Sequence, residues 1–110
     1  MQEVITMYEE FTQNRIAQLR TQRGVSARDM SLSLGQNDTY INKIENHKAL
    51  PSLQGLFYIC EYLNITPQEF FDENIHYPMA LNNLIADLRK LDADALNSVA
   101  SVVKELLRKK

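Results

Sequence analysis

Six polar side chains that can donate or accept hydrogen bonds lie within ten residues of one another: Asn37, Asp38, Thr39, Asn42, Lys43 and Asn46. Amide, hydroxyl, carboxylate and ammonium groups can pair with the donors and acceptors that base edges present in the major groove of DNA. Ile41 and Ile44 stand between them at helical spacing, so the polar groups would occupy the opposite, outward face of a helix. The segment therefore has the chemistry of a base-reading surface.

Residues that could support catalysis or metal binding are few and scattered. Cys60 stands alone in an apolar stripe, so we interpret it as a core residue that cannot form an internal disulfide. His47 and His76 are interpreted as surface or turn residues, and Glu9 and Glu10 as part of a solvated helix face. No nucleophile–base pair, metal-ligand cluster or phosphate-cradling glycine loop stands out. The sequence predicts a protein that is not an enzyme, uses no metal or cofactor and has no small-molecule substrate.

Two short helices joined by a tight turn are needed to position the polar set. Ser26 is predicted to cap the first helix, which ends before Gly35, a residue that accepts the positive φ of a sharp turn. Ser31 supplies a small side chain where the two helices would approach closely. Asn37 is predicted to cap the second helix, although it could also touch phosphate. This arrangement is typical of a helix-turn-helix.

Helical periodicity and capping signals extend over the rest of the chain, which has only three glycines and three prolines. Thr6 to Glu9 fits a capping box for the first helix, and Thr66 to Glu69 fits one for the fifth. The sequence predicts an all-α fold. Five helices form a DNA-binding domain over residues 1–72, a linker covers residues 73–78, and a helical hairpin covers residues 79–110.

Composition places the chain among globular proteins of one ordinary domain. It has 110 residues, a formal charge of −2, 45% hydrophobic and 24% charged residues. Residues 1–72 hold six Lys and Arg against nine Asp and Glu, so any DNA contact must come from a local basic face. No apolar run approaches the roughly 20 residues that span a bilayer. The start lacks the pattern of a signal peptide, which favours a cytoplasmic location.

The segment from about residue 12 to residue 72 resembles the helix-turn-helix domain of the Cro and lambda-repressor type. The resemblance is carried by ordered motifs: Arg15-Ile16-x-x-Leu19-Arg20, Ser26-Ala27-Arg28-Asp29-Met30, Leu34-Gly35, Tyr40-Ile41-x-x-Ile44-Glu45-Asn46, Leu50-Pro51-Ser52-Leu53 and Ile65-Thr66-Pro67. Members of this family are five-helix DNA-binding domains, usually dimeric transcriptional regulators of bacteria, phages and mobile elements. The resemblance implies the same fold, activity and origin for this chain.

The resemblance also implies roles for individual residues. Four would contact bases: Asn37, Asp38, Thr39 and Lys43. Five would hold phosphates under the same hypothesis: Ser26, Arg28, Tyr40, Asn46 and Lys48. Arg20 and Glu45 would form an ion pair that ties the first helix to the end of the recognition helix.

Three residues depart from the family pattern. Ala27 stands where a glutamine often contacts DNA, so one contact would be missing. His47 stands where a glycine is common, so either His47 or Asn46 must adopt a positive φ at a cost of about 1 kcal/mol. Asp38 would be repelled by phosphates but could accept from the amine of cytosine. Its placement in the first turn of a helix is explained slightly better by the helix dipole alone.

The apolar stripe of the C-terminal hairpin leaves two arrangements open. It could cover Ile5, Tyr8 and Phe11 of the first helix, or pair with a second copy of the chain. A homodimer through residues 79–107 could span two half-sites about 34 Å apart. The leading hypothesis is a repressor that binds a short inverted repeat as a homodimer. The alternative is a protein-interaction module, antitoxin- or antirepressor-like, whose C-terminal helices bind a partner protein.

Overall fold

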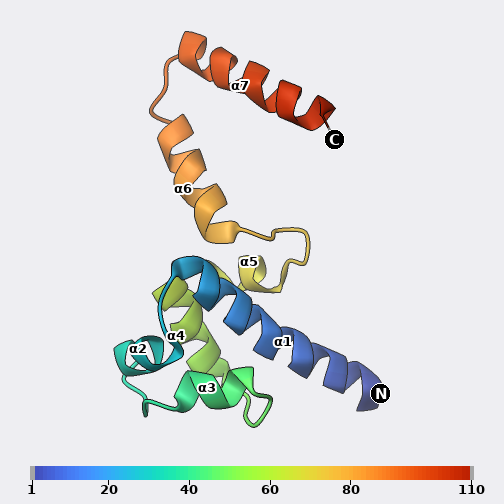
Figure 1. Ribbon diagram of the computed structural model, residues 1–110, viewed down its shortest axis with the longest axis vertical. Helices are drawn as coiled ribbons and strands as arrows, with labels where there is room; N and C mark the ends of the chain where they lie inside the picture. The colour runs from blue at the N-terminus through green and yellow to red at the C-terminus, as the bar shows by residue number, and fades with distance from the viewer. Residues whose placement is uncertain (1, 110) are drawn as a thin grey trace. The chain divides into compact units, whose positions relative to one another are not determined.

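The computed structural model describes residues 2–109, which form seven helices and no strand (Figure 1). This confirms the all-α prediction. The helices are α1 (Gln2–Arg23), α2 (Ala27–Ser33), α3 (Tyr40–Glu45), α4 (Leu53–Leu63), α5 (Pro67–Phe71), α6 (Pro78–Leu88) and α7 (Ala93–Arg108). The chain divides into two compact units, Met1–Met79 and Ala80–Lys110, which are described separately below.

The first unit has one hydrophobic core, to which each of α1 to α5 contributes. Its buried apolar residues are Ile16, Leu19, Met30, Ile41, Ile44, Leu56, Ile59, Cys60, Leu63, Ile65 and Phe70. All the buried positions of α1 lie between Gln13 and Leu19, so only the second half of this 22-residue helix packs on the core. The core therefore holds α2 and α3 against a rigid platform made of α1 and α4.

Several helix ends follow the capping signals of the sequence. Ser52 Oγ accepts a hydrogen bond from Gly55 N (3.0 Å) at the start of α4. Thr66 and Glu69 form a reciprocal capping box, with 3.1 Å from Glu69 N to Thr66 Oγ1 and 2.9 Å from Thr66 N to Glu69 Oε1. Asp92 Oδ1 accepts from Ala95 N (2.8 Å) and starts α7. These pairings satisfy backbone donors that a helix leaves open at its first turn.

Other local predictions were wrong. α1 begins at Gln2 and not at a Thr6 cap, and the Thr6 hydroxyl donates to Gln2 O (3.0 Å) within the helix. No glycine or proline precedes Thr6 in the chain, so nothing in the sequence prevents the helix from starting earlier. The spacing of Leu53 to Leu56, Ile59, Cys60 and Leu63 predicts one buried stripe on α4, but Leu53, the first residue of the helix, is 69% exposed.

The segment after α5, which was predicted to be a linker, is fastened to α1 by Arg15. This side chain is only 4% exposed. Its Nε donates to Phe70 O (2.7 Å), and its Nη2 donates to Glu69 O (2.9 Å), Ile75 O (2.7 Å) and Asp72 O (3.3 Å). The guanidinium thus takes up Phe70 O at the C-terminus of α5 and binds carbonyls of the segment that follows.

The Arg15 guanidinium keeps its charge, because arginine does not lose its proton in proteins. Burial lowers the pKa of its guanidinium, and the charge of Asp72 acts in the opposite direction. Gln22 reinforces the attachment from the next turns of α1, because its Nε2 donates to His76 O (2.8 Å). Residues 72–76 therefore belong to the packed body of the first unit.

The second unit contains the two predicted C-terminal helices, and their apolar side chains are largely exposed. No residue of α7 is buried, and in α6 only Pro78, which precedes the unit boundary, is buried. The exposed large apolar residues of α7 are Leu96, Val102, Val103, Leu106 and Leu107. Within residues 2–109, no helix combines the length and the apolar character that crossing a membrane requires.

Candidate nucleic-acid interface

The turn that follows α2 is built on Gly35. This residue adopts a φ of 73°, as predicted from the sequence. Gly35 N donates to Leu32 O and Gln36 N donates to Ser31 O, both at 3.0 Å. These two bonds form a Schellman motif, which ends a helix and reverses the chain over a residue with left-handed conformation. The turn therefore sends the chain from the end of α2 directly into the approach to α3.

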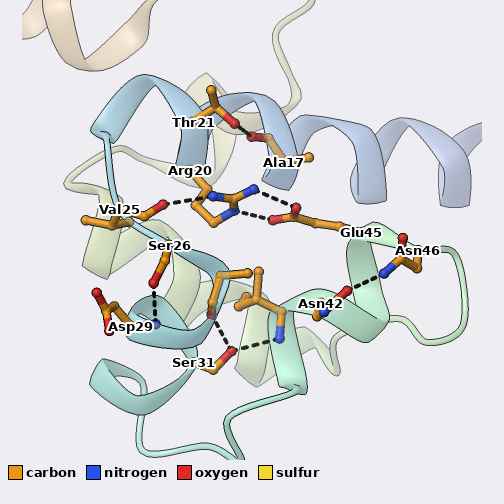
Figure 2. A network of polar contacts seen from close by, with 12 residues as sticks. Ala17, Arg20, Thr21, Val25, Ser26, Asp29, Ser31, Asn42, Glu45 and Asn46 are labelled. Atoms are coloured by element: carbon orange, nitrogen blue, oxygen red, sulfur yellow. Dashed lines mark hydrogen bonds and ion pairs between the residues drawn. The ribbon is translucent and has the colours of Figure 1, made fainter.

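Ser31 joins the two helices through its hydroxyl, as Figure 2 shows. The hydroxyl donates to Ala27 O (2.7 Å) and accepts from Ile41 N (2.9 Å). Ser31 and Ile41 are both fully buried. Because an unpaired buried N–H costs about 1–3 kcal/mol, the Ser31 hydroxyl fixes where the first turn of α3 lies against α2.

Arg20 and Glu45 join α1 to the last residue of α3 (Figure 2). Arg20 Nε lies 2.6 Å from Glu45 Oε2, and Arg20 Nη2 lies 2.9 Å from Glu45 Oε1. Arg20 Nη1 also donates to Val25 O (2.8 Å) in the connection between α1 and α2. The hydrogen bond to Glu45 raises the pKa of Arg20, while burial acts against it. One guanidinium thus fixes the position of α3 and the entry to α2 together.

The four predicted base-contacting residues are all exposed, but three of them lie before α3 and not on it. Asn37, Asp38 and Thr39 form the turn into the helix, and only Lys43 lies on α3 itself. The prediction that Asn37 caps this helix was wrong, because α3 begins at Tyr40. Asn37 Oδ1 instead accepts from Thr39 N (3.0 Å) and Thr39 Oγ1 (2.8 Å), a local turn that asparagine favours.

The sequence profile of a family described as a helix-turn-helix domain matches residues 14–74, more than half of the chain. The chain belongs to this helix-turn-helix family. The match runs from the buried half of α1 past the end of α5, so it includes α2, the Gly35 turn and α3. It confirms the resemblance found in the sequence. No curated protein and no solved structure matches the chain.

The residues predicted to hold phosphates differ in how they are placed in the helix-turn-helix domain. Ser26 caps α2 by accepting from Asp29 N (3.0 Å). Arg28 is exposed on α2, and its Nη1 lies 3.6 Å from Asp38 Oδ2. This pair was not anticipated, and it brings a positive charge to the carboxylate that phosphates would repel. Such exposed pairs contribute at most about 1 kcal/mol to stability, so Arg28 can still turn toward a phosphate.

The loop after α3 of the helix-turn-helix domain is shaped by His47 and Gln13. His47 has a φ of 61°, so the left-handed residue is His47 and not Asn46. His47 N donates to Ile44 O and Lys48 N donates to Lys43 O, which is a second Schellman motif. Asn46 Nδ2 donates to Asn42 Oδ1, and both side chains are exposed beside Lys48.

Gln13 is a residue that the sequence reasoning missed. It is 6% exposed, its Nε2 donates to Ala49 O (2.9 Å), and its Oε1 lies 2.6 Å from His47 Nδ1. Because the amide nitrogen is used by Ala49, the amide oxygen faces the imidazole and His47 Nδ1 must carry the proton. The available signal was the spacing to Ile16 and to Arg20, which places Gln13 on the core side of α1.

Tyr40 is half-buried, and its hydroxyl lies at the start of α4. A Cβ atom added to Gly55 would stand 2.7 Å from Tyr40 Oη and 3.1 Å from Ser52 Oγ. Burial raises the pKa of the Tyr40 phenol. The absence of a side chain at Gly55 leaves room for the Tyr40 hydroxyl at the start of α4, and Tyr40 packs against the core, so it has a packing role in addition to any proposed contact with phosphate.

The cations of the first unit are distributed unequally. Arg15 and Arg20 bind groups of the unit itself, and Arg23 donates to Tyr62 O and stacks 4.4 Å from the Tyr62 ring centroid. The three remaining cations are all exposed, and all belong to the helix-turn-helix or the loop that follows it: Arg28, Lys43 and Lys48. The exposed cations of the first unit that bind no group of its core therefore gather at α2, α3 and the following loop, beside the exposed carboxylates of Asp29 and Asp38.

Proposed function

We propose that the protein is a sequence-specific DNA-binding transcription regulator, a repressor that binds a short inverted repeat as a homodimer in the cytoplasm. The observation that carries this proposal is the helix-turn-helix itself. α3 is held by Ser31 and by the Arg20–Glu45 pair, while its outer side and the turn before it stay exposed. An α-helix fixed in this way fits the width of the major groove. The proposed activity involves no chemical step.

Within this proposal the exposed residues divide into two groups. Lys43, Thr39 and Asp38 would read base edges, with Asn37 shaping the turn that carries them. Ser26, Arg28, Tyr40, Asn46 and Lys48 would meet the sugar-phosphate backbone and set the register of the protein on the duplex. Two half-sites on one side of B-DNA lie about 34 Å apart, so a homodimer is required to bind both.

Selection of binding sites from a random DNA pool with the full chain tests the proposal. We expect one enriched palindrome whose half-sites are centred about one helical turn apart. Titration of the selected site against unselected DNA should then show at least a 10³-fold preference at physiological salt. Equal affinity for selected and unselected DNA would contradict the proposal.

Lys43→Ala and Lys48→Ala separate base reading from phosphate binding. Lys43→Ala should relax the preference at one position of each half-site, at a cost of about 1–3 kcal/mol. Lys48→Ala should weaken binding to every sequence. With two phosphate-contacting cations per protomer, Arg28 and Lys48, the log–log slope of affinity against salt should be about −4 in a dimer, and Lys48→Ala should reduce its magnitude by about 2. Lys90→Ala removes an exposed lysine of the second unit and serves as the control.

A protein-interaction module is the second candidate function. The exposed apolar side of α7 favours it, because large exposed apolar surfaces mark interaction sites. Affinity for DNA at low and moderate salt discriminates between the two. A regulator keeps a strong preference for its own site as salt rises, whereas a module that has lost DNA binding shows no sequence preference at any salt concentration.

A further inference from the structure

Lys48 lies in the loop after α3, between two residues that one side chain of α1 binds. Gln13 Oε1 accepts from Nδ1 of His47, the residue before Lys48, over 2.6 Å. Gln13 Nε2 donates to the backbone oxygen of Ala49, the residue after Lys48, over 2.9 Å. A single buried amide thus restrains the chain on both sides of a cation that is proposed to meet phosphate.

The loop itself has little packing that could hold it in place. Residues 46–50 are all exposed, and even Leu50 is 45% exposed. Gln13 is only 6% exposed and belongs to the half of α1 that packs on the core. Because a peptide group is planar, the bond to Ala49 O also fixes the orientation of the peptide group that joins Ala49 to Leu50. The body of the domain therefore restrains the loop through Gln13.

The backbone of His47 is strained to keep this arrangement. Its φ of 61° is a conformation that glycine adopts freely and that other side chains avoid. A glycine at this position would make the same turn without strain but would offer Gln13 Oε1 no imidazole. Strained residues of this kind persist where surrounding contacts hold them, and they cluster at functional sites. The strain at His47 therefore points to a loop whose fixed shape matters for function.

A polar hollow lies beside the loop, and carboxylates line it. Its walls include Glu9, Glu10, Gln13 and His47. Lys48 forms no ion pair with any residue from 2 to 109. A loop released from Gln13 would let the Lys48 ammonium reach these carboxylates, and a lysine paired in this way is less available to a phosphate. Holding the loop therefore keeps the charge of Lys48 free.

We propose that Gln13 is a positioning residue for the DNA contact: it holds His47 and Ala49 so that the ammonium group of Lys48 meets a phosphate of the duplex. This inference rests on the proposed function and adds to it a residue that need not touch DNA itself. Lys48 then binds without first losing the conformational freedom of its loop, and such preorganisation strengthens binding. Because phosphates carry no sequence information, Gln13 governs affinity and not base preference.

Gln13→Met tests the proposal, because methionine keeps the length of the side chain but lacks both groups of the amide. Affinity is titrated with the full chain at several salt concentrations, for a duplex enriched from a random pool and for an unselected duplex. We expect binding to both duplexes to weaken by about tenfold, with the preference between them unchanged. The magnitude of the salt slope should fall by about 2 in a dimer, as for Lys48→Ala, although Gln13 carries no charge. Gln68→Met, at an exposed glutamine of α5, is the matched control and should change neither quantity.

A double-mutant cycle with Lys48→Ala separates positioning from a general loss of stability. If Gln13 acts through Lys48, Gln13→Met should change affinity by less than about twofold once residue 48 is alanine. Hydrogen exchange in the free protein reports on the loop without DNA. The Lys48 amide, which donates to Lys43 O, should exchange at least about tenfold faster in Gln13→Met. The buried amide of Ile41, which donates to Ser31, should keep its exchange rate.

Four outcomes overturn the proposal. If Gln13→Met keeps the affinity and salt slope of an unaltered chain that prefers its selected site, the role of Gln13 is refuted and the proposed function stands. An equal loss of affinity with lysine and with alanine at residue 48 shows that Gln13 acts only through stability. Unchanged exchange of the Lys48 amide shows that the loop is held without Gln13. An unaltered chain that binds no DNA at any salt concentration overturns the proposed function together with this inference.

Discussion

Replacing Arg15 tests whether a single buried cation holds the end of α5 and the following segment against α1. Arg15→Met keeps an unbranched side chain of similar length but removes the donors that Arg15 gives to the carbonyls of Glu69, Phe70, Asp72 and Ile75. Glu69 O and Asp72 O keep backbone donors, from Asp72 N and Ile75 N, so Phe70 O and Ile75 O are the carbonyls most affected. Some of these carbonyls can turn to water when the guanidinium is gone. Phe70 O cannot do so easily, because its hydrogen bond to Arg15 is fully buried.

The magnitude follows from the carbonyls left without a partner. If two of them stay unsatisfied, the loss is about 2–6 kcal/mol at 1–3 kcal/mol each. Burial of the charged guanidinium is itself unfavourable, which is why burial lowers the pKa of Arg15. Replacing Arg15 with methionine removes this cost and so offsets part of the loss. We therefore expect the free energy of unfolding to fall by about 3 kcal/mol, a large share of the roughly 5–15 kcal/mol that stabilises a typical domain.

Urea unfolding of the full chain, followed by circular dichroism, measures this change. Arg15→Lys should lose about 2 kcal/mol, because an ammonium group keeps the charge but cannot reach the same carbonyls with a planar fork. Arg89→Met removes an exposed arginine in the turn after α6 and should change the free energy of unfolding by less than about 0.5 kcal/mol. A loss below about 1 kcal/mol for Arg15→Met would refute the reasoning, since it would show that water replaces the guanidinium at no cost.

Three further predictions concern backbone strain, packing and ionisation. His47→Gly should leave the free energy of unfolding in urea nearly unchanged, because relief of about 1 kcal/mol of left-handed strain balances the lost hydrogen bond to Gln13. His47→Ala loses the same hydrogen bond but keeps the strain, so it should be about 1 kcal/mol less stable than His47→Gly. Equal stabilities of the two variants would contradict this. Gly55→Ala should lower the free energy of unfolding by about 1 kcal/mol despite the better helix propensity of alanine, because the added methyl group meets the Tyr40 hydroxyl. The same substitution in a Tyr40→Phe background should cause no loss, and a double-mutant cycle measures the difference. Burial raises the pKa of Cys60 to about 11, so its thiol should resist alkylation at pH 8 until the chain unfolds. Because the pKa of Cys60 is higher in the folded than in the unfolded chain, the free energy of unfolding should fall as the pH rises from about 8.5 toward 11. A free energy of unfolding that does not change in this pH range would argue against a closed core, and so would fast alkylation of the folded protein.

Helix ends were predictable wherever their determinants lie within a few residues of one another. Ser26, Ser52 and Thr66 cap helices as their side chains and neighbours indicate, and Gly35 takes the positive φ of the turn. Local rules failed where two local structures compete. Asn37 could cap a helix or close a turn with Thr39, and the structure has the turn.

The proposed DNA-binding surface was only partly readable from the chain. The helical spacing of Ile41 and Ile44 placed Lys43 on the outer side of α3. The pairing of Arg28 with Asp38 was not readable, because it joins two side chains across the turn and depends on the angle between α2 and α3. The half-burial of Tyr40 was missed for the same reason, since it depends on how closely α4 approaches.

Sequence alone determined the all-α fold, most helix ends and the helix-turn-helix pattern, because periodicity, caps and turn residues act over distances of a few residues. Only the tertiary structure decided what Gln13 and Arg15 do, since all their partners except Gln18 lie 34 to 60 residues away along the chain. A polar residue at a buried helical position shows that a partner is needed, but packing selects that partner. The hydrogen bonds of these two residues therefore follow from the way the core brings the loop after α3 and the end of α5 against α1.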